Sequence, residues 1–328
     1  MKIRSRILNT LFLVLWKTPS FRSRLDDLIR QRIDEGILRH KLKVTPEGQP
    51  GLGLLWDELK DIDLLRSNVK QLGLQISRLL YSVPVTVARP SGESALPLTS
   101  RVCRQSDFAE AWFHKWCESL HLKPILHRKV WEYAYVLQAM NEAGCLTRGR
   151  SGIGFGCGEE PIPSLLASYG TDVTVTDLAP AQSTNLGWVG TGQHTSSLEQ
   201  AYYPDLVGRA TFEQRVDLEY VDMNQIPVHL DGKYDFCWSI CAFEHLGSIR
   251  RGLDFVRNSL RVLKPGGVAI HTTEFNLTNG ETIDNWQTVL FQSKHFELLA
   301  QELDAEGHSM LRLDADPGDA FLDRFVDL

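Results

Sequence analysis

The sequence lacks the two commonest glycine patterns of phosphate-binding loops. Its 328 residues contain no G-x-x-x-x-G-K-[ST], which excludes a Walker-type phosphate loop. Glycines do alternate from Gly152 to Gly158, but the dinucleotide pattern G-x-G-x-x-G would need a glycine where Cys157 or Glu159 stands. A dinucleotide fingerprint is therefore excluded at this run as well.

Positive charge and paired cysteines are also scarce. The formal net charge is −6 and the pI is about 5.9, which disfavours a nucleic-acid partner. The six cysteines form no C-x-x-C pair, so we expect reduced thiols in a cytoplasmic protein. His114, His121 and His127 are close in sequence, but their spacing offers no fourth ligand on one helix face. We therefore predict no metal site.

The apolar stretch of the N-terminal segment is too short to span a bilayer. Residues 1–17 combine Lys2, Arg4 and Arg6 with an apolar stretch from Ile7 to Trp16, whereas a spanning helix needs about 20 apolar residues. One interpretation is an interfacial helix on anionic lipid, peripheral to the inner membrane. The alternative, which we favour, is an amphipathic helix packed on its own domain or on a partner.

A heptad pattern lies within residues 1–81, which we predict to form a helical N-terminal region. Apolar residues recur seven apart between residues 55 and 81. The first set is Leu55, Ile62, Val69 and Ile76, and the second is Leu65, Leu72 and Leu79. Mostly β-branched residues in the first set and leucine in the second favour a two-stranded parallel coiled coil, hence a homodimer. The alternative is one amphipathic helix lying on the catalytic domain.

Residues 82–106 separate this region from the rest of the chain. Their prolines, glycine and serines predict an extended linker, followed by a domain at 107–328. Within that domain, helices are expected over 107–120 and 125–145.

The most informative run is GFGCGEEP at Gly154–Pro161. Gly156 and Gly158 allow the backbone to approach a ligand closely, where a Cβ would clash. Asp177 follows about 20 residues later, at the end of a predicted strand, where an acid can accept hydrogen bonds from ribose hydroxyls. The pattern predicts a cofactor-binding turn at the start of an α/β domain.

The order of the downstream segments carries a family resemblance. LEYVD at Leu218–Asp222 and YDFCWSI at Tyr234–Ile240 are predicted strands. CAFEHLGSI, a helix, LKPGG at Leu263–Gly267 and the strand VAIHTT follow. This succession resembles the class I S-adenosylmethionine-dependent methyltransferases, specifically the type 11 group. The resemblance covers residues from about 148 to 303 and implies a doubly wound, mainly parallel Rossmann-like α/β sheet, here with a helical N-terminal extension.

The resemblance implies a set of residues that bind the cofactor, S-adenosylmethionine. The set comprises Gly154, Gly156, Gly158, Asp177, Asp222, Met223 and Cys241. Asp177 would hold the ribose, and Asp222 with Met223 the adenine. The group usually has an acid where this chain has Gly154, and Glu159 and Glu160 are candidates to replace it. The step from Asp177 to Asp222 is also long, so an insertion including Asn185–His194 is predicted to cover the site.

In such methyltransferases a helix ahead of the first strand often lines the cofactor site. The resemblance therefore also implies candidate pocket residues at the start of the helix expected over 125–145: His127, Arg128, Trp131 and Glu132.

Several residues are candidates for catalysis. If the acceptor is a hydroxyl, a base near the methyl group takes its proton as the bond forms. His245 after Glu244 is the best-placed candidate, and His271 or Glu274 come next, with His194 weaker.

The acceptor that the resemblance suggests is a sugar hydroxyl on a surface glycan or glycan precursor. The alternatives are a small lipid-like or quinone-like acceptor, or a non-catalytic coiled-coil protein with a vestigial methyltransferase fold. The end of the sheet stays open: HSMLRL at 308–313 is a candidate further strand, but the closing hairpin usual in these enzymes is not evident.

Overall fold

A computed structural model describes residues 64–65, 68–69, 71–73, 99–180, 195, 197–320 and 323. The chain divides into two compact units, residues 1–82 and 83–328. The segment 1–17, most of the predicted linker and His194 lie outside the described residues. Of the predicted heptad positions, Leu65, Val69 and Leu72 are described; they are helical and 58–63% exposed. Their pairing with a second chain stays a prediction.

The second unit is built on a five-stranded sheet in the order β4-β3-β2-β5-β6, and every pairing is parallel. The strands are β2 (Ser151–Phe155), β3 (Asp172–Asp177), β4 (Val216–Tyr220), β5 (Tyr234–Ile240) and β6 (Leu263–Thr272). The central strands are apolar along their length because helices cover both faces of the sheet. This arrangement confirms the predicted doubly wound, Rossmann-like α/β fold.

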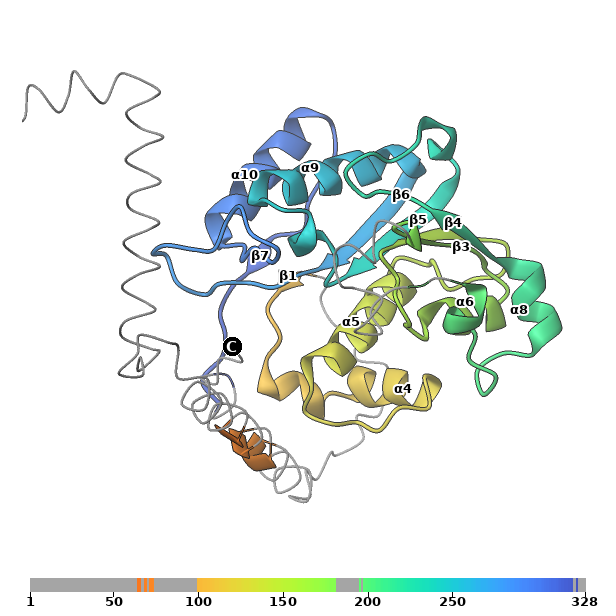
Figure 1. Cartoon of the computed structure of the whole chain (residues 1–328), viewed down its shortest axis with the longest axis horizontal. Helices are drawn as coiled ribbons and strands as arrows, with labels where there is room; N and C mark the ends of the chain where they lie inside the picture. Colours follow the sequence, from red (N-terminus) through yellow and green to blue (C-terminus); the bar gives the residue numbers. More distant parts are fainter. Residues whose placement is uncertain are drawn as a thin grey trace, which may run out of the picture. The chain divides into compact units, whose positions relative to one another are not determined.

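Helices lie on both sides of this sheet (Figure 1). One side carries α4 (Ala111–Ser119), α5 (Arg128–Glu142), α6 (Ile162–Ser168) and α8 (Arg209–Arg215). The other carries α9 (Ile249–Ser259) and α10 (Ser293–Ala305). Short 3₁₀ helices fill the connections: Gln105–Ala109, Leu198–Ala201, Val228–Leu230, Phe243–His245 and Leu260–Val262.

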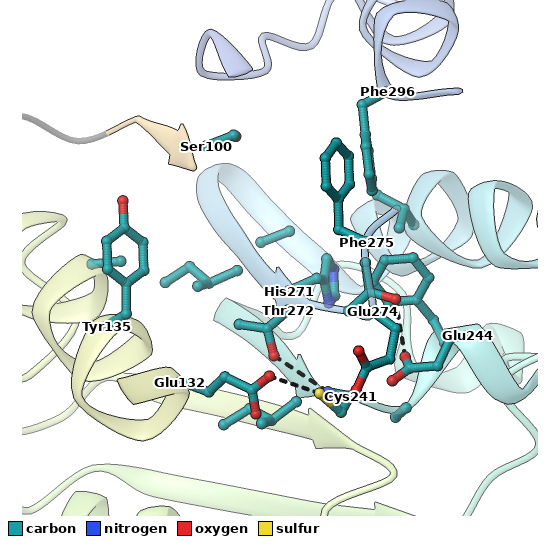
Figure 2. Close-up of a pocket in the computed structure, with 18 of the residues that line it drawn as sticks. Ser100, Glu132, Tyr135, Cys241, Glu244, His271, Thr272, Glu274, Phe275 and Phe296 are labelled. Carbon is teal, nitrogen blue, oxygen red and sulfur yellow. Dashed lines mark hydrogen bonds between the residues drawn. The ribbon is translucent and has the colours of Figure 1, made fainter. Parts of the chain in front are cut away.

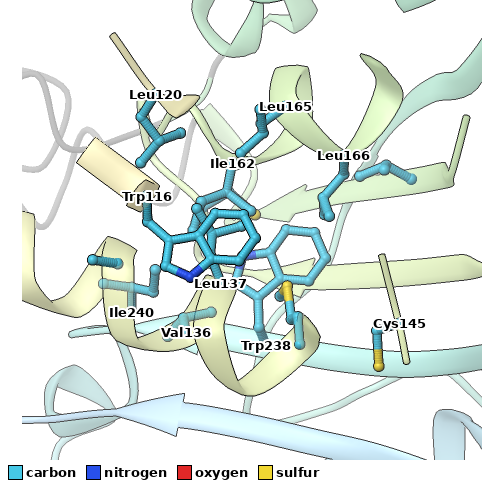
Figure 3. Close-up of a cluster of buried hydrophobic side chains, with 14 of the residues drawn as sticks. Trp116, Leu120, Val136, Leu137, Cys145, Ile162, Leu165, Leu166, Trp238 and Ile240 are labelled. Atoms are coloured by element: carbon cyan, nitrogen blue, oxygen red, sulfur yellow. The ribbon is translucent and has the colours of Figure 1, made fainter. Parts of the chain in front are cut away.

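Each side of the sheet has its own hydrophobic core. On the α5 side, Trp116, Leu137 and Trp238 are buried together (Figure 3). On the α9 side, Phe155 and Phe255 meet edge to face. Both cores pack against β2 and β5, so the carboxyl ends of these central strands are held firmly from both faces.

The predicted strand at HSMLRL is wrong for most of its length. Only β7 (Leu313–Asp314) is a strand, and it pairs with β1 (Ser100–Arg101) instead of joining the main sheet. An ion pair from Arg104 to Asp314 at 2.6 Å holds this short pairing in place. Residues 99–106, the end of the predicted linker, therefore belong to the second unit, and β6 is an edge strand of the described sheet.

Among the described residues, no helix combines the length and the apolar character needed to cross a membrane.

Candidate cofactor and active site

The glycine turn after β2 is packed too tightly for side chains. A Cβ on Gly154 would lie 2.3 Å from Cys157 Sγ and 2.5 Å from the Trp238 ring. A Cβ on Gly156 would lie 2.9 Å from Ala242 Cβ, and this residue has a φ of +61°. Only glycine fits such a left-handed, crowded position without strain. The protein's own atoms thus exclude side chains at Gly154 and Gly156, and close approach of a ligand to this turn stays a prediction.

Asp177 ties the end of β3 to this turn. Its buried carboxylate accepts backbone N–H groups from Gly158 at 3.2 Å, Thr195 at 2.9 Å and Leu178 at 2.7 Å. Thr195, from the predicted insertion, also donates its hydroxyl to the Gly158 carbonyl. Asp177 therefore orients the turn, and its carboxylate lies at the end of β3 where the ribose is predicted to bind.

Asp222 and Met223 follow β4 on the same side. Asp222 Oδ1 accepts the backbone N–H of Asn224 at 2.8 Å, which fixes the turn after the strand. Met223 is buried, with Sδ 3.3 Å from the position that a Gly156 Cβ would take. The predicted adenine-binding pair thus lies directly beside the glycine turn.

One cavity of about 2360 Å³ connects these residues to the carboxyl ends of β5 and β6. We call the part lined by Gly156, Gly158, Asp177, Asp222 and Met223 the turn end. The part lined by Glu132, Cys241, Glu244, His245 and Glu274 is the acidic end. Of the predicted cofactor residues, Gly154 alone does not line the cavity and lies beneath the turn.

The acidic end gathers side chains from α5, the segment after β5 and the segment after β6 (Figure 2). Cys241 has a φ of +48°, which is strained for a residue with a side chain. Its thiol donates to Glu132 Oε1 at 2.7 Å, and its backbone N–H donates to the Thr272 carbonyl at 3.1 Å. The strained backbone therefore directs the thiol toward α5.

Cations already accompany two carboxylates at the acidic end. Lys129 Nζ lies 2.8 Å from Glu132, and Arg128 lies 3.0 Å from Glu274. Ligand atoms of Cys241, Glu244 and Glu274 lie within 4.8 Å of one another, a set that could hold a metal ion. Because Arg128 neutralises one of these carboxylates, we assign no metal here, and the predicted absence of one stays a prediction.

Glu244 is the buried member of this group. Thr273 Oγ1 donates to its Oε2 at 3.1 Å, whereas its buried Oε1 has no hydrogen-bond partner. Burial raises the pKa of this carboxyl to about 8. A buried acceptor without a partner costs free energy, so this oxygen is suited to receive a donor from a bound molecule.

His245 is oriented by its other neighbours. Its Nδ1 lies 3.0 Å from the Gln287 carbonyl, which can only accept, so Nδ1 carries the proton and Nε2 has the lone pair. Nε2 lies 3.9 Å from Glu244 Oε1. Burial lowers the pKa of His245, which keeps the ring neutral near pH 7. The structure brings the predicted pair Glu244 and His245 together at the cavity.

His271 has a different setting. Its Nδ1 is 2.8 Å from Ser239 Oγ and its Nε2 is 3.2 Å from Ser259 Oγ, so both ring nitrogens are engaged. Burial lowers its pKa to about 4. This geometry favours a role in joining β5, β6 and α9, and it does not favour the predicted role of base.

The start of α5 supplies residues that sequence reasoning found only in part. Glu132 and Arg128 reach the acidic end as predicted, and the ion pair made by Lys129 was missed. Trp131 stacks on Tyr135 and donates to Asp107 at 2.8 Å, so it has a packing role. His127 caps the helix by accepting the N–H of Lys129.

Comparisons with known proteins agree with this site. Residues 153–271 match the family described as a methyltransferase domain, a range that includes the turn end, Glu244 and His245. No curated protein matches the chain. The parallel sheet confirms the predicted fold class, and the domain match agrees with it.

Several solved structures resemble the chain remotely. A sarcosine dimethylglycine methyltransferase from Galdieria sulphuraria has 20% identity and a TM-score of 0.37, over 53% of this chain and 62% of that one. An S-adenosylmethionine-dependent methyltransferase from Aquifex aeolicus has 18% identity and a TM-score of 0.33, over 51% and 77%. The PH0226 protein from Pyrococcus horikoshii has 16% identity and a TM-score of 0.38, over 60% and 84%. This chain thus spans less than two thirds of the Galdieria protein.

Proposed function

We propose that this protein is an S-adenosylmethionine-dependent methyltransferase that methylates a hydroxyl of a sugar, on a surface glycan or a glycan precursor. The observation that carries the proposal is the single cavity joining a cofactor-type glycine turn to an acidic end with an unpartnered oxygen on Glu244. The choice of a glycan as acceptor rests on the sequence resemblance. The choice of a hydroxyl as the reacting group rests on the carboxylates of the acidic end.

The turn end fits the cofactor. Gly156 leaves no room for a side chain, Asp177 would accept hydrogen bonds from the ribose, and Asp222 with Met223 would hold the adenine. When bound, the cofactor supplies a methyl group already activated by the positive charge on sulfur. The chain therefore contributes alignment of the acceptor and exclusion of water more than chemical activation.

The acidic end suits an acceptor with several hydroxyl groups. Carboxylate oxygens accept hydrogen bonds from hydroxyl groups, and Glu132 and Glu274 each lie beside a basic side chain. Glu244 Oε1 has no partner among the described residues and can take the hydroxyl that reacts. These three side chains would orient a polyol without adding positive charge near the sulfonium.

A proton must leave the hydroxyl as the carbon–oxygen bond forms. Glu244 and His245 are the two groups placed to accept it, because their facing atoms lie 3.9 Å apart beside the cavity. In either case the proton ends on the Glu244–His245 pair, and the acceptor leaves as a methyl ether.

The test is transfer of labelled methyl from S-adenosylmethionine to size-fractionated glycans and glycan precursors. We expect label in an alkali-stable ether of a sugar-containing fraction, and loss of that label in a Glu244→Ala, His245→Ala double variant. Label confined to protein, amines or lipid without sugar would contradict the proposal.

A second candidate acceptor is a lipid-like molecule, because the cavity also has an apolar wall. Val268 and Ile270 of β6 line it, as do Phe275, Phe296 and Leu303 (Figure 2 shows Phe275 and Phe296). An aliphatic or quinone-like acceptor would bury this surface. Label recovered in an organic-solvent extract would favour this candidate over a free glycan.

A further inference from the structure

The space beneath the glycine turn is filled by a tryptophan. Trp238 of β5 is paired in register with Gly154 of β2, and the missing side chain at Gly154 leaves room for the indole ring. The indole N–H donates to Glu160 Oε1 at 2.6 Å. This hydrogen bond holds the carboxyl group of Glu160 beside the indole ring, beneath the glycine turn.

Glu160 is an acid in the wall of the cavity. The residue is only 4% exposed, yet it lines the cavity next to Cys157 and Gly158. Within the described residues, no basic side chain lies within ion-pair distance of its carboxylate. A buried carboxylate without a cation is costly, so the site favours a ligand that brings positive charge.

Three other acids of the cavity have partners that set them apart from Glu160. Asp177 accepts three backbone N–H groups, Glu132 pairs with Lys129, and Glu274 pairs with Arg128. Glu244 lies at the acidic end. Glu160 is thus a buried acid of the glycine turn with no ion-pair partner among the described residues.

We propose that Glu160 binds the α-ammonium group in the methionine part of S-adenosylmethionine. The proposal rests on the proposed function, since it names a contact of the same cofactor. Trp238 and Cys157 hydrogen-bond to the carboxylate and fix its position, and the ammonium group would take an acceptor position that remains. Glu160 thereby supplies the acid that is absent at Gly154, from a position six residues later in the chain.

Several titratable groups face Glu160 and set its protonation. They are Cys157, Asp177, Lys129 and Tyr133, with Tyr203 from the predicted insertion. Burial raises the pKa of Glu160 to about 7, and the Trp238 hydrogen bond and Lys129 oppose this rise. Because the ammonium group needs the ionised carboxylate, binding below pH 7 must release a proton.

The test uses calorimetric titration of the full chain with two ligands. S-adenosylhomocysteine carries the ammonium group, whereas 5′-methylthioadenosine lacks the amino-acid part. For Glu160→Gln we expect about a 10- to 100-fold loss of affinity for S-adenosylhomocysteine and less than a twofold change for 5′-methylthioadenosine. The amide oxygen of glutamine can still accept the Trp238 N–H, which protects the fold.

Matched variants make the result specific. Glu159→Gln changes an exposed neighbour that accepts from Gln200 at 2.9 Å, and it should leave both affinities unchanged. The wild-type affinity for S-adenosylhomocysteine should fall severalfold from pH 8 to pH 6, and that of Glu160→Gln should stay flat. An equal loss for both ligands, or no loss for either, would overturn the role of Glu160. If the wild-type chain binds neither ligand, the proposed function itself fails.

Discussion

The two ends of the cavity differ in how far the chain satisfies its own polar groups. At the turn end, Asp177 uses three backbone N–H groups and Gly156 is packed against Ala242 and Met223. At the acidic end, Glu244 keeps an unpartnered oxygen and Cys241 holds a strained backbone. The difference indicates that the turn end is preorganised for one ligand. The polar groups of the acidic end depend on a second molecule to satisfy their hydrogen bonds.

The largest effect is expected at the acidic end. Replacing its proton acceptor should lower kcat by about 10²- to 10⁴-fold. The pH profile identifies that acceptor. If Glu244 is the base, the rate rises with pH through about 8, since the protonated carboxyl cannot accept a proton. If His245 is the base, the rise in rate lies at lower pH, because burial lowers the pKa of His245 below its ordinary value.

Glu244→Gln separates these outcomes when kcat is measured from pH 5.5 to 9. Loss of the rise near pH 8, together with the fall in rate, supports Glu244 as base. A variant with unchanged rate and profile would exclude it, and His245→Ala then becomes the decisive variant.

At the turn end, we expect added side-chain volume to lower the stability of the fold more than a change of charge does. Gly154→Val would place atoms inside the contact distances to Cys157 Sγ and Trp238, and should destabilise the fold by about 3 kcal/mol. Gly280→Ala is the matched control, since nothing lies within 4 Å of its added Cβ. Urea unfolding measures both variants. A Gly154→Val protein as stable as Gly280→Ala would show that the turn is looser than described.

Glu160 links protonation to stability at the turn end. Its pKa is raised by burial to about 7 in the folded chain, so ionisation above pH 7 costs folding free energy that is recovered as the pH falls toward 4.5. The Glu160→Gln variant should therefore gain stability relative to the wild type as the pH rises. We expect its advantage in unfolding free energy to be about 2–3 kcal/mol larger at pH 8 than at pH 5. Paired urea unfolding curves at the two pH values test this. An offset that does not change with pH would contradict the buried, cation-free setting.

A substitution remote from both ends gives the smallest expected effect. Arg250 pairs with Asp254 at 2.7 Å and Glu302 at 3.0 Å, but its side chain is 53% exposed. Arg250→Ala should cost no more than about 1 kcal/mol in unfolding free energy and leave ligand affinity unchanged. A larger loss would mean that the contact between α9 and α10 supports the cavity.

Local sequence patterns predicted much of the fold and of the turn end. The apolar run of β5 defined that strand from Tyr234 to Ile240, and the spacing from Gly156 to Asp177 identified the turn. These features depend on neighbours in sequence: strand periodicity, left-handed glycine and an acid at a strand end. The Glu244–His245 pair was found for the same reason.

Contacts between distant segments could not be read in this way. The pairing of β7 with β1 joins residues more than 200 positions apart in the sequence, and no local sequence pattern predicts it. The two serines that engage His271 come from β5 and α9. Glu160 reaches its place through a tryptophan in β5, so its setting requires the register between β2 and β5.

The central claim is that the turn end binds the adenosine part of S-adenosylmethionine through Asp177. The most direct measurement is calorimetric titration of the purified full chain with S-adenosylhomocysteine, beside an Asp177→Ala variant whose folding is verified by circular dichroism. The account predicts binding by the wild-type chain and its loss in the variant. A folded wild-type chain that does not bind, or a variant that binds equally well, would contradict it and would favour a non-catalytic role for this fold.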